Sequence, residues 1–392
     1  MGLRSLRLVC RCGYYLRRPK TIQRLIIRFA IVGLGHIGCR HAALIDTHPE
    51  AELVAVCDTA LSQLYSSTSE ATPLSPGEGL GERSALVSPV SQPQWLQEVP
   101  PFADITQMLA QVPCDVVCIC TPNGLHAEQA ITCLKAGRNV VIEKPMALTV
   151  ADCDAIIGAA HHYDRQVFGV MQNRYSPASA WLKEVVTEGQ LGKVLQVHLD
   201  CYWNRDARYY YNFDGTPHAW HGDETLDGGV LFTQFAHFID LLCWTFGRVS
   251  VTGARFTNQT HQGIHTFADT GMVHLSLEHG AIGSLNFSTA IWDRNFESTL
   301  TVIGSEGTVK LGGQYMNELR YCHVRNLIAP ALAPTAPAND YGPYSGSAAN
   351  HHFVIDNVVE ALNGRAAVAT TAEEGREVVR TIQEIYAASE KV

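Results

Sequence analysis

A glycine-rich turn between an apolar run and a helical pattern constrains the fold of this chain more than any other feature. Residues 25–32 are mostly apolar, Gly33-Leu34-Gly35-His36-Ile37-Gly38 follows, and a helix-like segment extends to about Ile45. In a strand–turn–helix unit, the first glycine permits the tight turn and the second lets backbone N–H groups approach a pyrophosphate. The third glycine lets the helix pack closely on the strand. The pattern therefore predicts a dinucleotide site formed by Gly33, Gly35, His36, Ile37 and Gly38.

An acidic residue at the end of the next apolar run indicates which dinucleotide is bound. Residues 52–57 form a second β-type run, and Asp58 closes it 20 residues after Gly38. A carboxylate at this place hydrogen-bonds the ribose 2′-OH and repels a 2′-phosphate. Asp58 therefore favours NAD over NADP as the cofactor.

The order of the apolar segments predicts two kinds of sheet. Short apolar runs at 52–57, 114–120 and 140–142 alternate with helical stretches, which is typical of a doubly wound parallel sheet of the Rossmann type. After about residue 165, period-two segments are joined by tight turns, as at His279-Gly280, and indicate a large, open, mostly antiparallel sheet. The fold class is therefore α/β followed by α+β.

This pattern divides the chain into three parts. We expect a basic N-terminal extension at 1–24, a dinucleotide-binding domain at 25–150, and a substrate and oligomerisation domain at 151–392. Two late helices, at about 353–362 and 371–388, are expected to pack back on the core.

Two segments lie outside this regular pattern. Residues 1–28 carry eight Arg or Lys and no acidic residue, which fits a disordered extension or an early start codon; an organelle transit peptide is the alternative. Between residues 66 and 93, 16 of 28 residues are Ser, Thr, Pro or Gly. We interpret this insertion as a flexible surface loop, with a substrate lid as the alternative.

Charge and hydropathy exclude several functions. The chain carries 29 basic and 38 acidic residues; without the eight cations of residues 1–28, the remainder balances 21 against 38, or −17. Such an acidic body repels phosphate backbones, which argues against nucleic acid as a partner. No stretch approaches the roughly 18 apolar residues of a membrane span, so we expect no membrane insertion.

The twelve cysteines favour a reducing compartment. They are scattered from Cys10 to Cys322, several lie inside apolar runs, and no paired CxxC sets with zinc-site spacing occur. Buried, reduced thiols in a cytoplasmic protein explain this better than a disulfide framework. We therefore predict no metal site.

Polar residues follow two further predicted strands. Thr121-Pro122-Asn123 and His126 come after the strand at 114–120, and Glu143-Lys144-Pro145 comes after the strand at 140–142. The carboxyl ends of parallel strands meet at one edge of the sheet, where cofactor and substrate should also meet. We expect Thr121, Pro122, Asn123, His126, Glu143, Lys144 and Pro145 to border the cofactor site.

With the glycine loop, these motifs make the chain resemble the Gfo/Idh/MocA family, named after glucose-fructose oxidoreductase and inositol dehydrogenase. In that family the lysine of the Glu-Lys-Pro motif lies by the nicotinamide and the substrate hydroxyl, and the proline is commonly cis. The resemblance implies these roles for Lys144 and Pro145, and it extends from about residue 27 to 386.

The second half of the chain continues the resemblance. Gly228-Gly229 followed by His237 and Asp240 resembles the family's GG…HxxD helix, whose histidine faces the reacting carbon. His237 is thus implied as the second catalytic residue, and Thr233 shares its helix face. Polyol-oxidising relatives carry an aspartate where this chain has Thr233, which argues against inositol-type activity.

Three further stretches lie at residues 173–177, 201–210 and 344–351. They resemble the branch of the family that oxidises nucleotide-linked amino sugars at C3, such as UDP-N-acetylglucosamine or its uronic acid. Arginine forks suit diphosphates or a carboxylate, and aromatic rings stack on sugar or uracil; sheet-surface packing is the alternative role of the aromatic residues. The residues implied to bind substrate are Asn173, Arg174, Tyr175, Arg205, Tyr209, Tyr210, Thr233, His237, Tyr344 and Asn350.

The sequence thus favours an NAD-dependent sugar dehydrogenase in which Lys144 or His237 accepts the hydroxyl proton. Two alternatives remain open: an NAD-dependent glycosidase acting through transient C3 oxidation, and a non-catalytic sensor of NAD and sugar. Because relatives often pair the open faces of their sheets, we expect a homodimer or homotetramer.

Overall fold

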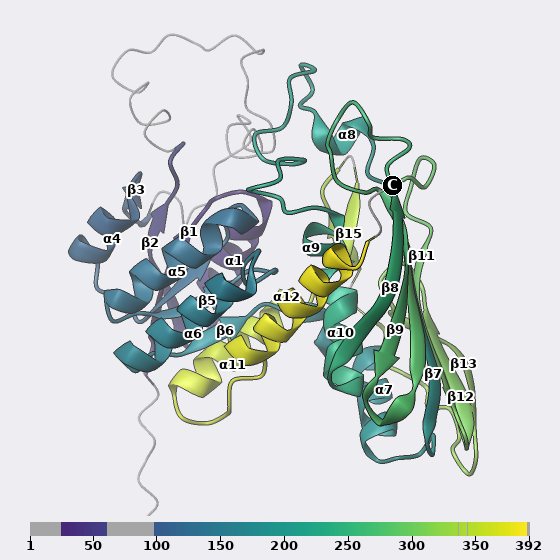
Figure 1. Ribbon diagram of the computed structural model, residues 1–392. Coiled ribbons are helices and arrows are strands. Elements are labelled where there is room, and N and C mark those ends of the chain that lie inside the picture. The colour runs from purple at the N-terminus through teal and green to yellow at the C-terminus, as the bar shows by residue number, and fades with distance from the viewer. Residues whose placement is uncertain (1–24, 61–97, 336, 343, 390–392) are drawn as a thin grey trace, which may run out of the picture.

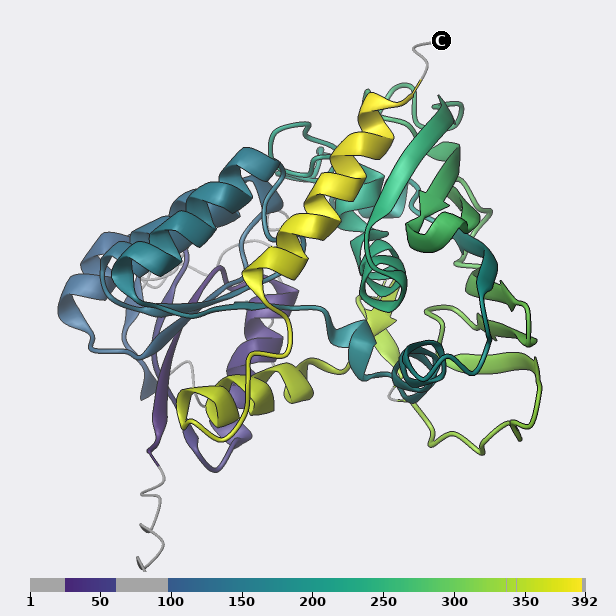
Figure 2. The ribbon, with the colours of Figure 1, turned by 60° about the horizontal axis from the view of Figure 1, so that its bottom comes forward.

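The computed structural model describes residues 25–60, 98–335, 337–342 and 344–389. The basic extension at 1–24 and the insertion at 66–93 therefore lie outside the described residues. Figure 1 shows two sheets side by side, with the long C-terminal helix α12 (Ala372–Ala387) crossing between them. Figure 2 shows the same arrangement from below, with α12 again between the two halves.

The first sheet is parallel throughout, as the sequence predicted. Its strands are, in order across the sheet, β3 (Pro101–Phe102), β2 (Ala51–Cys57), β1 (Ile27–Val32), β4 (Val116–Ile119), β5 (Asn139–Ile142) and β6 (Val167–Gly169). The order reverses at β1, so the crevice at the carboxyl ends of β1 and β4 is the expected ligand position.

Helices cover both faces of this sheet. One face packs against α1 (His36–Thr47) and α11 (His351–Leu362), whose buried residues share one apolar cluster with β1. The other face packs against α4 (Ile105–Gln111), α5 (His126–Lys135), α6 (Val150–Tyr163) and α12. The sheet is therefore doubly wound.

The predicted boundary at residue 150 lies too early. β6 pairs in parallel with β5, so the first sheet extends to Gly169. The sequence pattern hid this strand because three residues are too few to show a period.

The second sheet is mixed but mostly antiparallel, as predicted. Its strands are, in order, β13 (Glu318–Val324), β12 (Gly307–Gly312), β11 (Glu297–Gly304), β7 (Val194–Tyr202), β10 (Ile282–Ser288), β9 (Thr270–Leu277) and β8 (Val249–Thr257). Only the β7–β10 pair is parallel. The turn predicted at His279-Gly280 joins β9 to β10, and β11 and β12 form a second antiparallel hairpin.

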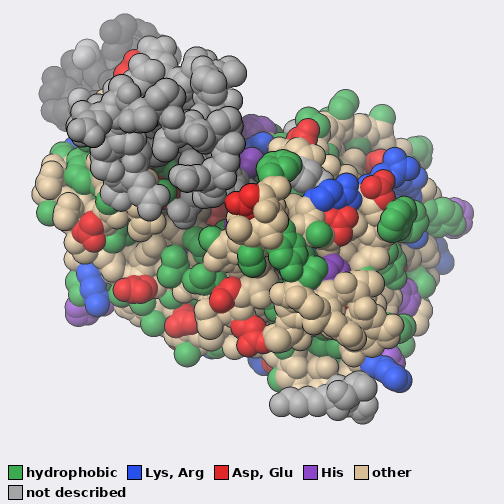
Figure 3. All heavy atoms as spheres, turned by 90° about the horizontal axis from the view of Figure 1, so that it is seen from above, with side chains coloured by type: hydrophobic (Ala, Val, Ile, Leu, Met, Phe, Trp, Pro, Cys, Tyr) green, Lys and Arg blue, Asp and Glu red, His purple; other side chains and the backbone are tan. Residues whose placement is uncertain are grey.

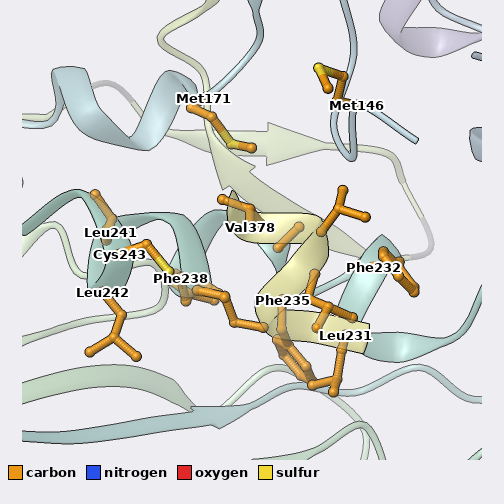
Figure 4. Close-up of a cluster of buried hydrophobic side chains, with 14 of the residues drawn as sticks. Met146, Met171, Leu231, Phe232, Phe235, Phe238, Leu241, Leu242, Cys243 and Val378 are labelled. Atoms are coloured by element: carbon orange, nitrogen blue, oxygen red, sulfur yellow. The ribbon is translucent and has the colours of Figure 1, made fainter. Parts of the chain in front are cut away.

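Further helices and short strands complete the fold. The remaining ones are η3 (Asn123–Leu125), η4 (Gln172–Tyr175), α7 (Pro177–Thr187), α8 (Ala207–Tyr210), α9 (Val230–Thr233), α10 (Ala236–Phe246), η5 (Glu278–Gly280), β14 (Ala338–Asp340) and β15 (Ser345–Ala348). Figure 4 shows the apolar cluster in which Phe235, Phe238 and Leu241 pack near Val378 of α12 and Met171. This packing fixes α10, and with it the predicted catalytic histidine, relative to the first sheet.

One face of the second sheet carries no helix in Figure 1. The strand register places Met272, Ile282 and Tyr321 on one face of the sheet, and each of these side chains is more than half exposed. None of the helices in the described part of the chain combines the length and apolarity needed to cross a membrane.

Candidate active site

Each glycine of the predicted dinucleotide loop occupies its position for a different geometric reason. Gly33 has φ +90°, and a Cβ there would lie 2.7 Å from the carbonyl oxygen of Cys120. A Cβ on Gly38 would lie 1.9 Å from the carbonyl oxygen of Gly33, so only glycine lets α1 approach β1 this closely. Gly35 faces open space, with no atom within 4 Å of its Cβ position. The loop thus leaves room for a pyrophosphate beside Gly35, where the N-terminus of α1 favours negative charge.

Asp58 lies at the end of β2, beside this loop. Its Oδ2 accepts a hydrogen bond from the backbone N–H of Leu34 at 2.8 Å, and its Oδ1 accepts one from Ala60 at 2.8 Å. These bonds hold the carboxylate at the cavity wall, where a ribose hydroxyl can reach its remaining lone pairs. The donor and acceptor set therefore fits the adenosine side of a dinucleotide without a 2′-phosphate.

A cavity of about 690 Å³ runs from this loop to the inner face of the second sheet. It brings together most of the residues that the sequence predicted. The predicted residues that line it are Gly33, Gly35, His36, Ile37, Asp58, Thr121, Pro122, Asn123, His126, Glu143, Lys144, Arg205, Tyr209, Thr233, His237 and Tyr344. The cofactor loop and the substrate-side residues therefore share one space.

Seven predicted residues do not line this cavity: Gly38, Pro145, Asn173, Arg174, Tyr175, Tyr210 and Asn350. Gly38 lies beneath the loop, and Pro145 forms the cis peptide bond that the family resemblance implied. Tyr210 is buried against His261 and His265.

The motif at residues 173–175 is structural. The guanidinium of Arg174 forms a buried bidentate ion pair with Asp240, at 2.6 and 2.8 Å, and its Nη1 contacts Glu374 at 2.9 Å. Asn173 accepts a hydrogen bond from the hydroxyl of Ser347 at 2.6 Å. Tyr175 stacks on Phe353, with ring centroids 5.3 Å apart. These side chains therefore hold elements together and do not line the cavity.

Asn350 has a similar structural position. Its Nδ2 donates to the hydroxyl of Ser176 at 3.2 Å and to the carbonyl of Gln172 at 3.4 Å. In the turn η4, which carries residues 173–175, Gln172 is the residue that lines the cavity. No sequence motif pointed to Gln172.

Lys144 projects into the cavity beside the second half of the chain. Its Nζ donates a hydrogen bond to the backbone carbonyl of Thr233 at 2.6 Å. Burial lowers the pKa of Lys144, although the nearby carboxylate of Glu143 opposes this shift. A lysine of this kind can lose its proton nearer to neutrality than an exposed one and act as a base.

The carboxylate of Glu143 lies beside two histidines from distant elements, of which His41 is hydrogen-bonded to it. His41 of α1 contacts its Oε1 at 2.9 Å, and Nε2 of His351 of α11 lies 3.6 Å from the same oxygen. Burial raises the pKa of Glu143, but the hydrogen bond from His41 and nearby positive charge outweigh it and lower the pKa to about 2. The three groups could offer donor atoms to an ion, all within 4.8 Å of one another. The hydrogen bond to His41 already gives Glu143 a close partner.

His237 and Thr233 lie on the cavity wall opposite the cofactor loop. His237 is buried, and its Nε2 lies 3.1 Å from the side-chain nitrogen of Gln172. Burial lowers the pKa of His237 well below its usual value, and the charge of Lys144 adds to this effect. The hydroxyl of Thr233 donates to the buried carboxylate of Asp227 and accepts from Asn123 at 2.9 Å.

Arg205 is a buried cation held by neutral groups. Its guanidinium lies 4.9 Å from the ring centroid of Trp203 and 4.8 Å from that of Tyr344. Its nitrogens donate to the carbonyls of Asn204 and Ser345 and to the side-chain oxygen of Asn295. Among the described residues, no carboxylate pairs with it, and burial lowers its pKa.

Comparisons with known proteins agree with this geometry. A family model described as "GFO/IDH/MocA C-terminal domain" matches residues 180–310, and one described as "Oxidoreductase family, NAD-binding Rossmann fold" matches residues 82–170. The chain belongs to the GFO/IDH/MocA family of oxidoreductases. It therefore carries an NAD-binding Rossmann domain, and the glycine loop and Asp58 fit that cofactor.

Two solved structures resemble the whole fold. The WlbA dehydrogenase from Bordetella pertussis, in complex with NADH and UDP-GlcNAcA, is 29% identical with a TM-score of 0.74, covering 92% of this chain and 96% of that one. The WlbA dehydrogenase from Chromobacterium violaceum, with the same ligands, is 28% identical with a TM-score of 0.74, covering 93% and 94%.

Curated relatives match over shorter stretches. D-glucoside 3-dehydrogenase from Escherichia coli is 31% identical over 43% of this chain and 41% of its own length. A 4-carboxy-2-hydroxymuconate-6-semialdehyde dehydrogenase from Sphingobium is 28% identical over 47% of this chain and 55% of its own length. The chain thus matches about half the length of these relatives.

Asp58→Ala should weaken NAD binding and narrow the preference for NAD over NADP, because the ribose acceptor and the repulsion of phosphate are both lost. Isothermal titration with both cofactors measures the effect, which we expect to be about 10-fold or more for NAD. The control is Asp46→Ala, an exposed carboxylate on α1. Unchanged affinities for both cofactors would show that Asp58 does not contact the ribose.

Proposed function

We propose that this protein oxidises a hydroxyl group, at C3, of a nucleotide-linked N-acetyl amino sugar or its uronic acid. The likeness to the two WlbA dehydrogenases supports the class of substrate. The observation that carries the proposal is Arg205, a buried guanidinium on the cavity wall with no carboxylate partner among the described residues. A buried charge is costly unless it is paired, so the site favours a ligand with an anionic group.

Several aromatic residues lie beside Arg205 in the same cavity. Tyr209 stacks on His221 with ring centroids 4.0 Å apart, and both line the cavity with Trp220. His218 also lies there, stacked on His221. Flat rings and a guanidinium together suit a sugar or nucleobase that carries a phosphate or carboxylate. The sequence motifs pointed to Tyr209, whereas Trp220 and His221 come from an irregular segment that carries no motif.

The surface is consistent with a small-molecule ligand in place of nucleic acid. On the described surface visible in Figure 3, Lys and Arg side chains are scattered, and several lie next to acidic ones. Nucleic acid binding requires a basic patch or stripe.

The chemistry assigned to this site is the loss of a hydroxyl proton together with oxidation of its carbon. When bound, NAD⁺ supplies the hydride acceptor. We assign the acceptance of the hydroxyl proton to Lys144 or His237, which line the cavity on different elements. Asn123 and Thr233 lie in the cavity wall between Lys144 and His237. Hydrogen bonds to Asp227 hold both side chains in position. The Glu143 carboxylate, which is hydrogen-bonded to His41, holds the segment that carries Lys144.

A substrate panel tests the proposal. UDP-N-acetylglucosaminuronic acid, UDP-N-acetylglucosamine and N-acetylglucosamine are each incubated with NAD⁺ and followed by absorbance of reduced cofactor and by the mass of the oxidised product. We expect turnover with the nucleotide sugars, and Arg205→Met should raise KM for the anionic substrate by roughly 30-fold or more.

The control for that variant is Arg208→Met, which alters an exposed arginine nearby, and thermal unfolding shows whether each variant remains folded. An unchanged KM for the nucleotide sugars in Arg205→Met would contradict the anionic-substrate proposal. A free sugar with regenerated NAD⁺ would instead indicate a glycosidase, and absence of any turnover would favour a sensor.

Substitution of the two candidate proton acceptors gives a second test. If both residues act on one developing alkoxide, Lys144→Ala and His237→Ala should each lower kcat by roughly 10²–10⁴, the usual worth of general acid–base catalysis. The double variant should lose much less than the product of the two effects, because residues that act on one group are non-additive. NAD binding should survive in all three, and full multiplicative loss would place the residues on separate steps.

We further propose that the open face of the second sheet pairs with a second copy of the chain. The exposed apolar side chains of Met272, Ile282 and Tyr321 on this face support the proposal. Light scattering should report a dimer or tetramer, and Ile282→Asp should shift the protein toward monomer. A monomer in the wild type would contradict the pairing.

A further inference from the structure

A buried amide contacts the predicted catalytic histidine. Gln172 and His237 are each 2% exposed, and their side-chain nitrogens Nε2 lie 3.1 Å apart. As placed, the amide of Gln172 donates its N–H to the lone pair of Nε2, which requires a neutral imidazole with its proton on Nδ1. Nδ1 itself is buried and has no hydrogen-bond partner within the described part of the chain.

The turn that carries Gln172 is tied to the helix that carries His237. Two residues after Gln172, Arg174 pairs with Asp240 through two bonds of 2.6 and 2.8 Å. Asp240 lies three residues after His237 on α10, about one helical turn away. The backbone carbonyl of Gln172 also accepts a bond from Asn350. The contact between the amide and the imidazole is therefore held from both sides.

The position four residues before His237 offers the imidazole no carboxylate. Thr233 stands there and turns its hydroxyl toward Asp227. The site thus retains a carboxylate, but its hydrogen bonds go to Thr233 and to the backbone N–H groups of Gly222 and Gly229. Among the described residues, His237 has neither an ion pair nor a hydrogen bond with a carboxylate.

The charged groups around His237 oppose its protonation. Lys144 and His351 disfavour an imidazolium, and Glu143 is the carboxylate that favours it. Glu143 is already occupied by His41 at 2.9 Å and by the backbone N–H of Lys144 at 3.2 Å. A second buried cation beside Lys144 would therefore lack a partner of its own, which is costly.

We propose that Gln172 is a positioning residue that occupies the Nε2 lone pair of His237, keeps the imidazole neutral and leaves Lys144 as the proton acceptor. The inference rests on the proposed function. The O–H bond of the substrate breaks and its proton goes to the neutral Nζ of Lys144, while a hydride leaves the same carbon for NAD⁺ and C=O forms. Lys144 afterwards releases the proton to solvent, and His237 shapes the wall against which the reacting carbon lies.

Nuclear magnetic resonance of the full chain with ¹⁵N-labelled histidine tests the state of the imidazole directly. The His237 signals are assigned by their loss in His237→Gln. In the wild type we expect a neutral ring with its proton on Nδ1 and no titration between about pH 5.5 and 8, although a free histidine titrates near 6.5. Gln172→Glu places a carboxylate at Nε2 and should bring a titration into this window.

A wild-type imidazole that titrates above about pH 6, or that carries its proton on Nε2, would overturn the proposal. This measurement needs no substrate, so it separates the two claims. If the sugar panel shows no turnover while the ring behaves as expected, the proposed function fails and the assignment of Gln172 stands.

Kinetics give the second readout. Gln172→Leu should lower kcat by roughly 10-fold or more and leave NAD affinity unchanged, because only the orientation of His237 is lost. The value of kcat/KM should rise with pH as Lys144 loses its proton, in wild type and in Gln172→Leu alike. The matched control is Gln166→Leu, an exposed glutamine before β6. A pH-rate limb that disappears in Gln172→Leu would contradict the assignment of the base to Lys144.

Discussion

The buried ion pair between Arg174 and Asp240 organises the substrate side of this protein. It joins the turn η4 to α10, and the same guanidinium reaches Glu374 at the start of α12. These elements come from three distant parts of the chain, so one side chain sets their mutual positions. Removing either partner would leave an uncompensated charge in the core, which is why such pairs are strongly destabilising when broken.

The cavity beyond this pair contains charges that are only partly balanced. The negative charges of Glu143 and Asp227 partly balance the positive charge of Lys144. Arg205, in contrast, is surrounded by aromatic rings and carbonyl groups. Low dielectric makes each of these interactions strong, so the charge of a ligand decides how well it enters. The same imbalance disfavours a protonated His237. Recognition of an anion and the choice of proton acceptor therefore follow from one distribution of charge.

Local patterns in the sequence predicted the parts of the fold that depend on neighbouring residues. The glycine loop, Asp58 and the Glu143–Lys144 motif lie at strand ends, and the order of strands brings these ends together. The hairpins and both C-terminal helices were also confirmed, within one or two residues at most ends. In contrast, Asn173, Arg174 and Asn350 were expected to bind substrate because the family resemblance implied it. Their structural partners, such as Asp240 and Glu374, lie 66 and 200 residues away, which no local pattern reveals.

Gln172 was missed for the same reason, since its contact with His237 spans 65 residues and no periodicity marks it. The position of Thr233 was noticed as a departure from relatives, but the sequence could not show that its hydroxyl bonds Asp227. The predicted boundary at residue 150 was too early because α6 leads to β6, which pairs with β5 and extends the first sheet beyond the last strong motif.

The packing of α11 has a consequence for how the chain acquires its structure during synthesis. The outer face of β1 is covered by Val354, Ile355, Val358 and Val359, which are made more than 300 residues after Ile31. Until the ribosome has released this helix, the nucleotide-binding sheet exposes to water the part of this apolar face that α1 does not cover. Such long-range closure is slow, and the nascent intermediate is prone to aggregation. The sheet that carries the cofactor loop is thus fully covered only after α11, near the C-terminal end of the chain, has been synthesised.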